Sequence, residues 1–260
     1  MIQFNSLKNV KKSNKIFACM CIIITLILSY MLYASEYHYS DDKETLTTAI
    51  NDFLWPYKPE SKYKVLEKNK VGRILVASFK DQIDENNYGV AVFVKGLNNR
   101  YRILRTQRSP ADYSSVVQVY ELEINNKSYY AVNGYNLAKE IAFYGLNYYD
   151  YYSTDDKSEE QKTKTLQFAV EKPQFLEIYR AKELDEKAIG GYDEEALKYR
   201  NSSASLYNAS GNDITAQYEI ANKINPYSSA SAKMELFLLN IYIGIIMVFG
   251  AVLTRYFLTK

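Results

Sequence analysis

The residues able to do chemistry are few. His38 is the only histidine, which argues against a histidine-rich zinc site and against a Ser-His-Asp triad, because both need imidazole. The sequence also lacks a phosphate-binding loop and a dinucleotide-binding fingerprint. We therefore predict no catalytic residue, no metal site and no cofactor, and an enzyme is the less favoured interpretation.

Acidic residues cluster at several points, including Asp41 with Asp42, Asp155 with Asp156, and residues 193–195. Paired carboxylates catalyse glycoside hydrolysis or bind calcium. None of these clusters has the spacing of a calcium-binding loop, and acidic residues are common on exposed loops. A carboxylate-dependent hydrolase therefore ranks below the two binding functions described below.

Tyrosine is the most unusual feature of the composition, with 26 copies in 260 residues. The densest group consists of Tyr144, Tyr148, Tyr149, Tyr151 and Tyr152. Tyrosine rings bury a large area and offer a hydroxyl, so this group is a candidate surface for a cell-wall glycan or another ligand. We favour the alternative that tyrosine fits β-strands and that an AT-rich genome enriches it. The composition is interpreted as bacterial.

Two apolar runs must position everything else. The first covers residues 16–33, and the second covers residues 236–257 and is uncharged up to Thr254. A helix rises about 1.5 Å per residue, so each run matches the thickness of a bilayer core. We predict a transmembrane helix in each run, because backbone polar groups in lipid must pair within the segment.

Charge around the two spans predicts their orientation. Lys8, Lys11, Lys12 and Lys15 precede the first span, whereas all 30 acidic residues lie between the spans. The positive-inside rule then places both termini in the cytoplasm and the central region outside it. That region holds 26 basic residues against its 30 acidic ones, so the basic excess belongs to the cytoplasmic ends. It does not indicate nucleic-acid binding.

A cleaved signal peptide is the alternative for the first span, with cleavage after Ala34. The apolar run is longer than the usual core of about 7–15 residues in such peptides. Leu32, at the position three before cleavage, is not small. We therefore favour a retained anchor.

Small and weakly polar residues recur on one face of each span. They are Cys21, Thr25 and Ser29 in the first span, and Asn240, Gly244, Val248 and Ala251 in the second. Such residues let helices approach closely in lipid. We predict that the spans pack together, or against a partner's helices, along these faces; the alternative is that the pattern arises by chance.

The central region has the pattern of an α+β, β-rich domain. Ser40 or Asp41 is expected to cap a helix with Leu46, Ala49, Ile50, Phe53 and Leu54 on one face, ending at Trp55 before Pro56. Strands are expected at residues 73–79, 89–94, 101–105, 116–124 and 128–132. This order is similar to that of cystatin-like folds, in which a helix packs across a curved antiparallel sheet. The similarity transfers no functional residue.

The predicted organisation has seven segments. They are a basic tail (1–15), a first span (16–33), an α+β domain (36–133), a second β-rich region or continuation (134–224), a linker (225–235), a second span (236–257) and a cytoplasmic end (258–260). In the second region we expect a charged loop at 155–164, a short helix at 193–200, and a hairpin of 205–207 with 214–220 that turns at Gly211.

Three functions remain. The first, which we favour, is an interaction or scaffold protein that docks in a membrane complex, with the lipid bilayer and another membrane protein or itself as partners. The second is a module that binds cell-wall glycan or another ligand through tyrosines. The third is the hydrolase. No nucleic acid is expected as a partner.

Overall fold

The computed structural model describes residues 11–57, 59–83, 87–108, 116–124, 126–135, 137–154, 157–189, 200–218 and 229–259. The chain divides into two compact units. The first contains both chain ends and one internal segment, residues 95–102. The second contains residues 41–94 and 103–230. The predicted α+β class, with antiparallel sheets and an apolar helix near each end, is confirmed.

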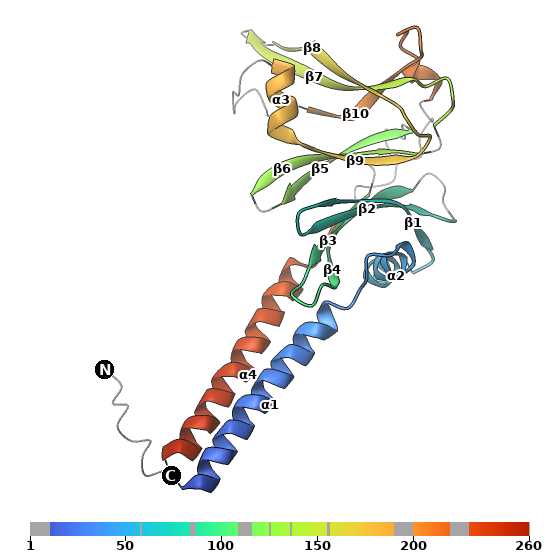
Figure 1. The fold of residues 1–260 in the computed structure, drawn as a ribbon. Coiled ribbons are helices and arrows are strands. Elements are labelled where there is room, and N and C mark those ends of the chain that lie inside the picture. Colours follow the sequence, from blue (N-terminus) through green and yellow to red (C-terminus); the bar gives the residue numbers. More distant parts are fainter. Residues whose placement is uncertain are drawn as a thin grey trace. The chain divides into compact units, whose positions relative to one another are not determined.

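The first unit is built on two helices, α1 (Lys12–Glu36) and α4 (Lys233–Thr259), which lie side by side (Figure 1). Both are long and apolar enough to cross a membrane. Most of their large apolar side chains are exposed. The two predicted spans lie inside these helices.

The second unit contains a helix followed by antiparallel strands. Helix α2 (Lys43–Leu54) begins at Asp42, whose carboxylate accepts a hydrogen bond from the backbone nitrogen of Thr45 at 2.8 Å. The cap is thus one residue later than predicted. Leu46, Ile50 and two other residues of the predicted face are buried, and α2 packs against strand β1.

One sheet has five strands in the order β1-β2-β3-β4-β11. Its strands are β1 (Tyr63–Val71), β2 (Ile74–Asp81), β3 (Tyr88–Lys95), β4 (Tyr101–Arg108) and β11 (Ser229–Ser231). Strands β2 and β3 are the apolar runs recognised in the sequence, and both their faces are buried. The sequence did not predict β1.

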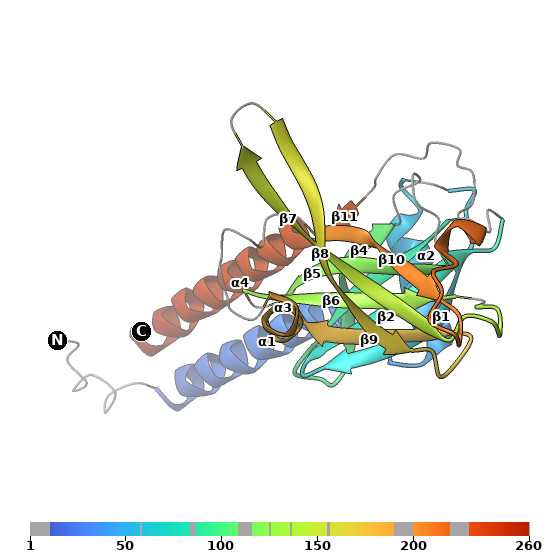
Figure 2. The same ribbon diagram turned by 90° about the horizontal axis from the view of Figure 1, so that it is seen from above.

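The other sheet has six strands in the order β8-β7-β10-β5-β6-β9. They are β5 (Val117–Ile124), β6 (Lys127–Gly134), β7 (Phe143–Thr154), β8 (Lys157–Ala169), β9 (Phe175–Arg180) and β10 (Arg200–Tyr207), with helix α3 (Ala181–Ile189) after β9. Asn126 has a φ of 58° in the turn between β5 and β6, a conformation that asparagine tolerates. Figure 2 shows α3 and the long β7–β8 hairpin from above.

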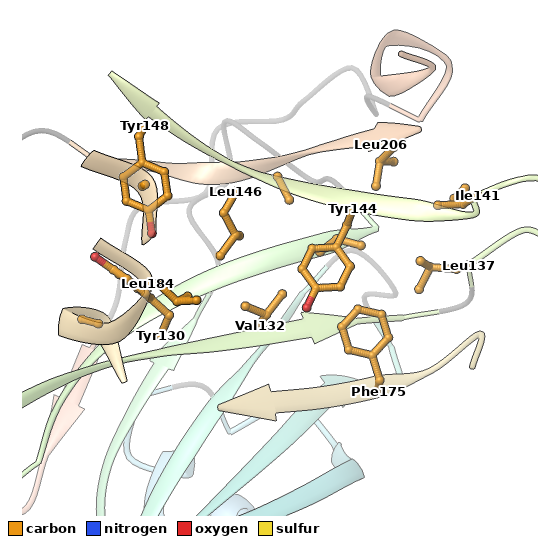
Figure 3. Packing of buried hydrophobic residues seen from close by; sticks show 14 of the residues in the cluster. Tyr130, Val132, Leu137, Ile141, Tyr144, Leu146, Tyr148, Phe175, Leu184 and Leu206 are labelled. Carbon is orange, nitrogen blue, oxygen red and sulfur yellow. The ribbon is translucent and has the colours of Figure 1, made fainter. Parts of the chain in front are cut away.

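Two apolar clusters hold the second unit together. Within the six-stranded sheet, Tyr144 and Leu146 of β7 lie opposite Val132 of β6 and Phe175 of β9, because the sheet curls over its own core (Figure 3). On the other side, alternate residues of β5 such as Leu122 pack against residues of β2 and β3. Strands β5 and β6 therefore have an apolar cluster on each face.

Several local predictions were wrong. Residues 157–164, expected in a charged loop, continue strand β8, and the same hairpin contains β7 up to Thr154. Ile214 does not start a strand but precedes a 3-10 turn, Thr215–Gln217. Gly211 does take a positive φ, 79°, as its place in the turn predicted. Residues 193–199 of the expected helix, residues 1–10, and residues 225–228 of the linker lie outside the described residues.

Candidate functional site

Arg102 joins the ends of the two apolar helices. Its side chain is only 4% exposed, although arginine is rarely buried without a partner. Its Nε atom lies 3.4 Å from Oε2 of Glu36, in the last turn of α1. Its Nη2 atom lies 3.3 Å from Oε2 of Glu235, in the first turn of α4. We call these three residues the arginine clamp.

The guanidinium suits this position because its donors spread in a plane and it stays charged at any ordinary pH. One arginine therefore neutralises a carboxylate from each helix. Arg102 is the second residue of β4 and belongs to residues 95–102, which run from the end of β3 through the turn into the start of β4; we call this segment the β3–β4 turn. The clamp thus ties both helix ends to one turn.

The β3–β4 turn is also bonded directly to α1 and to the residues that follow it. The backbone nitrogen of Leu97 donates to the hydroxyl of Tyr33 at 2.6 Å. The Nδ2 atom of Asn98 donates to the carbonyl of Tyr37 at 2.7 Å. A Cβ atom on Gly96 would lie 2.6 Å from both Tyr33 and Tyr37, so the absence of a side chain there permits this close approach.

A short strand pairing completes the junction. Tyr39 and Tyr101 form an antiparallel bridge, with N to O distances of 3.1 Å and 2.7 Å. Backbone bonds hold a turn more rigidly than side-chain contacts alone, since they leave no rotamer freedom. The helix ends and the β3–β4 turn therefore form one rigid local structure.

The helices themselves meet through Thr25 of α1 and Gly250 of α4. A Cβ atom on Gly250 would lie 2.1 Å from Oγ1 of Thr25, so only glycine allows this contact. At one end of the pair, the rings of Phe17 and Phe257 stack with centroids 5.5 Å apart. These two contacts show that the helices run antiparallel.

The small residues predicted on α1 lie on the side that meets α4. Cys21 and Ser29 are half-buried and share the face of Thr25 by helical spacing. The Oγ atom of Ser29 is buried with no hydrogen-bond partner among the described residues. The hydroxyl of Thr25 instead donates to the carbonyl of Cys21 at 2.7 Å. It therefore has a hydrogen-bond partner within its own helix where the two helices meet.

The small residues predicted on α4 lie elsewhere. Asn240, Gly244, Val248 and Ala251 are exposed, and nothing lies within 4 Å of a Cβ added to Gly244. The sequence analysis missed Gly250, which contacts α1. The less exposed positions of α4 include four residues that recur at spacings of three and four, namely Leu239, Ile243, Ile246 and Gly250. This spacing could have identified the side of α4 that contacts α1.

An apolar groove of about 430 Å³ runs beside this contact. It is lined by Ile22, Thr25, Leu26, Met247, Gly250, Ala251, Thr254, Arg255 and Leu258. Ala251 is the one predicted α4 residue that borders it. In a bilayer, lipid chains would fill a groove of this kind between two apolar helices.

Two of the five residues in the tyrosine group are buried and not solvent-facing. Tyr144 and Tyr148 are buried in the core of the six-stranded sheet (Figure 3). The ring of Tyr144 stacks with those of Phe168 and Phe175 at centroid distances of 5.2 and 5.3 Å. Tyr149, Tyr151 and Tyr152 belong to β7, but their side chains lie outside the described ones. Burial removes two of the five candidates from any glycan surface.

Glu177 links two strands that face each other across the curled six-stranded sheet. Its carboxylate accepts a hydrogen bond from the hydroxyl of Tyr144 at 2.6 Å and another from Tyr179. Burial is the main reason why the pKa of the Tyr144 hydroxyl is raised, and the neighbouring carboxylate adds to the effect. The hydroxyl therefore stays protonated and acts as a donor. This network connects β7 to β9 and has a structural role.

A polar groove of about 270 Å³ lies between β1 and β9. It is lined by Glu67, Lys68, Glu171, Lys172, Gln174, Phe175, Leu176 and Glu177. Glu67 pairs with Lys43 at 3.1 Å and accepts from Gln174 at 3.1 Å, and Glu177 accepts from two tyrosines. The carboxylates of Glu67 and Glu177 thus stabilise the fold, and the mixture of acidic and basic side chains in the groove favours no particular ligand.

Among the carboxyl groups that the structure describes, Asp185 on α3 has the most strongly raised pKa. It is 2% exposed, and its Oδ1 atom lies 3.5 Å from the hydroxyl of Tyr130. Burial raises its pKa to about 7, and the charges of Glu121 and Glu186 push it in the same direction, whereas a hydrogen bond with Tyr148 lowers it. The group therefore titrates near neutral pH inside an apolar core.

Among the described residues, no group of three or more histidine, cysteine or acidic side chains is arranged to hold a metal ion. Cys19 and Cys21 are free thiols on α1. The chemistry of the described part is thus dominated by structural ion pairs and hydrogen bonds.

These features define a class of protein: a β-rich unit on the same chain as two antiparallel apolar helices, with an arginine clamp at one end of the helix pair. No protein-family model, curated protein or solved structure matches this chain.

Proposed function

We propose that the protein is a bacterial membrane-anchored interaction or scaffold protein, a subunit or accessory of a membrane complex. Both helices cross the cell membrane, the termini lie in the cytoplasm, and the β-rich unit lies outside. Lysines at the start of the chain and the confinement of every acidic residue to the stretch between the two apolar runs support this orientation. The outward-facing apolar side chains of both helices support lipid as their solvent.

The arginine clamp carries the proposal. Two helices that serve only as membrane anchors need no buried charged side chain to remain in lipid. Here one arginine connects the outer ends of both helices to the β3–β4 turn, so this turn and the two helix ends cannot move independently. Such a rigid connection suits a protein that transmits position or holds another membrane protein in register.

The partner's docking face is the small-residue side of α4. Asn240, Gly244 and Val248 lie on this side, and α1 does not cover them. In lipid, small residues allow a second helix to approach, and an amide seeks a hydrogen-bond partner. We therefore place a helix of another membrane protein, or of a second copy, against this face.

Photo-crosslinking of the full chain in its own membranes tests this assignment. Val248 lies on the proposed face and Phe249 on the far side of α4, and each is 66% exposed. A photoreactive residue at position 248 should give a protein adduct of one defined mass, while the matched residue at 249 should react with lipid. Equal protein adducts from both positions, or adducts with lipid alone, would remove the docking face.

Orientation is tested separately. A reporter enzyme that is active only in the cytoplasm, fused after Lys260, should be active. The same reporter inserted in the exposed turn at residues 208–213 should be silent. The reverse pattern would overturn the proposed topology.

A further inference from the structure

Leu97 is out of place for a residue in a water-exposed turn. It is 82% exposed, the highest value among the large hydrophobic side chains that are described and exposed. Scattered apolar residues on a protein surface need no explanation. Leu97, however, stands at the tip of a turn that is fixed firmly, so its exposure does not result from a loosely held loop.

The position of Leu97 relative to α1 is known within the first unit. Its backbone nitrogen is hydrogen-bonded to the hydroxyl of Tyr33, a residue one turn before the end of α1 at Glu36. The ring of Tyr33 stacks on that of Tyr37 with centroids 4.6 Å apart. Tyrosine rings near the end of a membrane helix mark the boundary between lipid and water. Leu97 is therefore held at the depth of that boundary.

The charges around the tip suit a phospholipid surface. Glu36 and Glu235 would repel lipid phosphates, but Arg102 pairs with both. Lys95 and Arg100 flank the tip, and Arg100 is exposed. Basic side chains beside an exposed apolar residue form the usual pattern of a segment that enters the headgroup layer.

We propose that the tip of the β3–β4 turn inserts Leu97 into the outer headgroup layer of the bilayer that the helices cross. The exposed Arg100 contacts a lipid phosphate beside it. The turn is thus a third contact with the membrane, shallow and non-spanning. This inference rests on the proposed membrane anchoring. It adds a contact between the outer lipid surface and a turn that is rigidly connected to both helices.

A depth measurement tests the inference on the full chain. Cys19 and Cys21 are replaced by alanine, and single cysteines are introduced by Leu97→Cys, Ile23→Cys or Ala209→Cys. Each is labelled with an environment-sensitive dye and reconstituted in vesicles of phosphatidylethanolamine and phosphatidylglycerol. Lipids with a nitroxide near the headgroup or deep in the chain report depth, and aqueous iodide reports exposure to water.

The label at 97 should be quenched several-fold more by the shallow nitroxide than by the deep one, and little by iodide. The label at 23 should respond to the deep nitroxide, and the label at 209 to iodide. If the label at 97 behaves like that at 209 while the label at 23 is still quenched in lipid, the tip does not insert, although the anchoring stands. If the label at 23 is not quenched by lipid, the proposed function itself fails. Equal shallow quenching at 97 and 209 would also overturn the assignment to the tip.

Discussion

The Oγ1 atom of Thr25 lies 2.1 Å from the position that a Cβ atom on Gly250 would occupy. The two helices of the first unit are therefore in van der Waals contact through a hydroxyl side chain and a bare backbone. In lipid, where the hydrophobic effect does not drive helices together, contacts of this kind supply the packing energy.

Replacing Gly250 with leucine should separate the helices. In a chain without its native cysteines, Phe17→Cys and Phe257→Cys should be joined by a short bifunctional thiol cross-linker in membranes, because the two rings that they replace are stacked. Gly250→Leu should lower the cross-linked fraction several-fold. Gly244→Leu is the matched control, since its site is open, and it should cross-link normally. Undiminished cross-linking with Gly250→Leu would show that this contact does not exist in the membrane.

Replacing Arg102 with alanine should destabilise the junction. Glu36 and Glu235 would lose their shared partner, but their side chains are 40% and 66% exposed, so water compensates in part. We expect a loss of about 1–2 kcal/mol, less than for a fully buried pair. Thermal unfolding of the detergent-solubilised chain should show a melting temperature several degrees lower.

Arg100→Ala provides the comparison for Arg102→Ala. Arg100 is exposed in the same turn, so its removal should leave the melting temperature unchanged. A similar fall for both variants would mean that net charge, and not the clamp, sets the stability.

Asn51 should be among the most sensitive polar residues of α2. Its side-chain amide donates to the carbonyl of Tyr63 at 2.9 Å and accepts from the nitrogen of the same residue at 2.8 Å. Asn51→Leu removes both bonds, and we expect a cost of about 2 kcal/mol. Asn51→Asp keeps the acceptor and should cost less. The neighbouring exposed Asp52, replaced by alanine, should have little effect in the same unfolding experiment.

Asp185 should make stability depend on pH. Its folded-state pKa of about 7 is above the ordinary value of 3.8, so between these values the folded chain keeps a proton that the unfolded chain has lost. The contribution of this group is therefore greatest below about pH 4, falls as the pH rises to about 7, and is constant above that. The loss reaches about 4 kcal/mol at most.

Asp185→Asn should remove this dependence. The carboxamide stays neutral, so the variant should be more stable than the parent at pH 8 and should gain little at pH 4. Glu183→Gln, on the exposed side of the same helix, should change neither value. Equal stability of Asp185→Asn and the parent at pH 8 would show that folding does not raise the pKa of this carboxyl.

Much of the fold was predictable from local patterns. The helices α1 and α4 follow from uncharged runs, β2 and β3 from continuous apolar stretches, and β5 from its alternation. Strand β1 was missed because its second half, with Lys68 and Lys70 among its residues, is polar. It lies at the sheet edge, where half-exposed side chains are hydrated and the apolar signal disappears.

The candidate site was harder to predict. Arg102 has its partners far away in the chain, so no local pattern marks it. On α4, the exposed side and the side that faces α1 are both apolar, so the sequence pattern does not distinguish them and Gly250 was overlooked in favour of Gly244. For Tyr144 and Tyr148, composition alone does not separate a surface ring from a core ring. Whether a tyrosine ring is buried or exposed depends on how the six-stranded sheet curls.

The bonds that α2 makes to β1 have one more consequence. Strand edges with free N–H groups template aggregation when copies are concentrated, as they are in the plane of a membrane. The N–H groups of Tyr63 and Val65 are occupied by Asn51 and Thr47. Fibril-like growth through this stretch of β1 is blocked by these bonds, which act in addition to the exposed charge of Lys64.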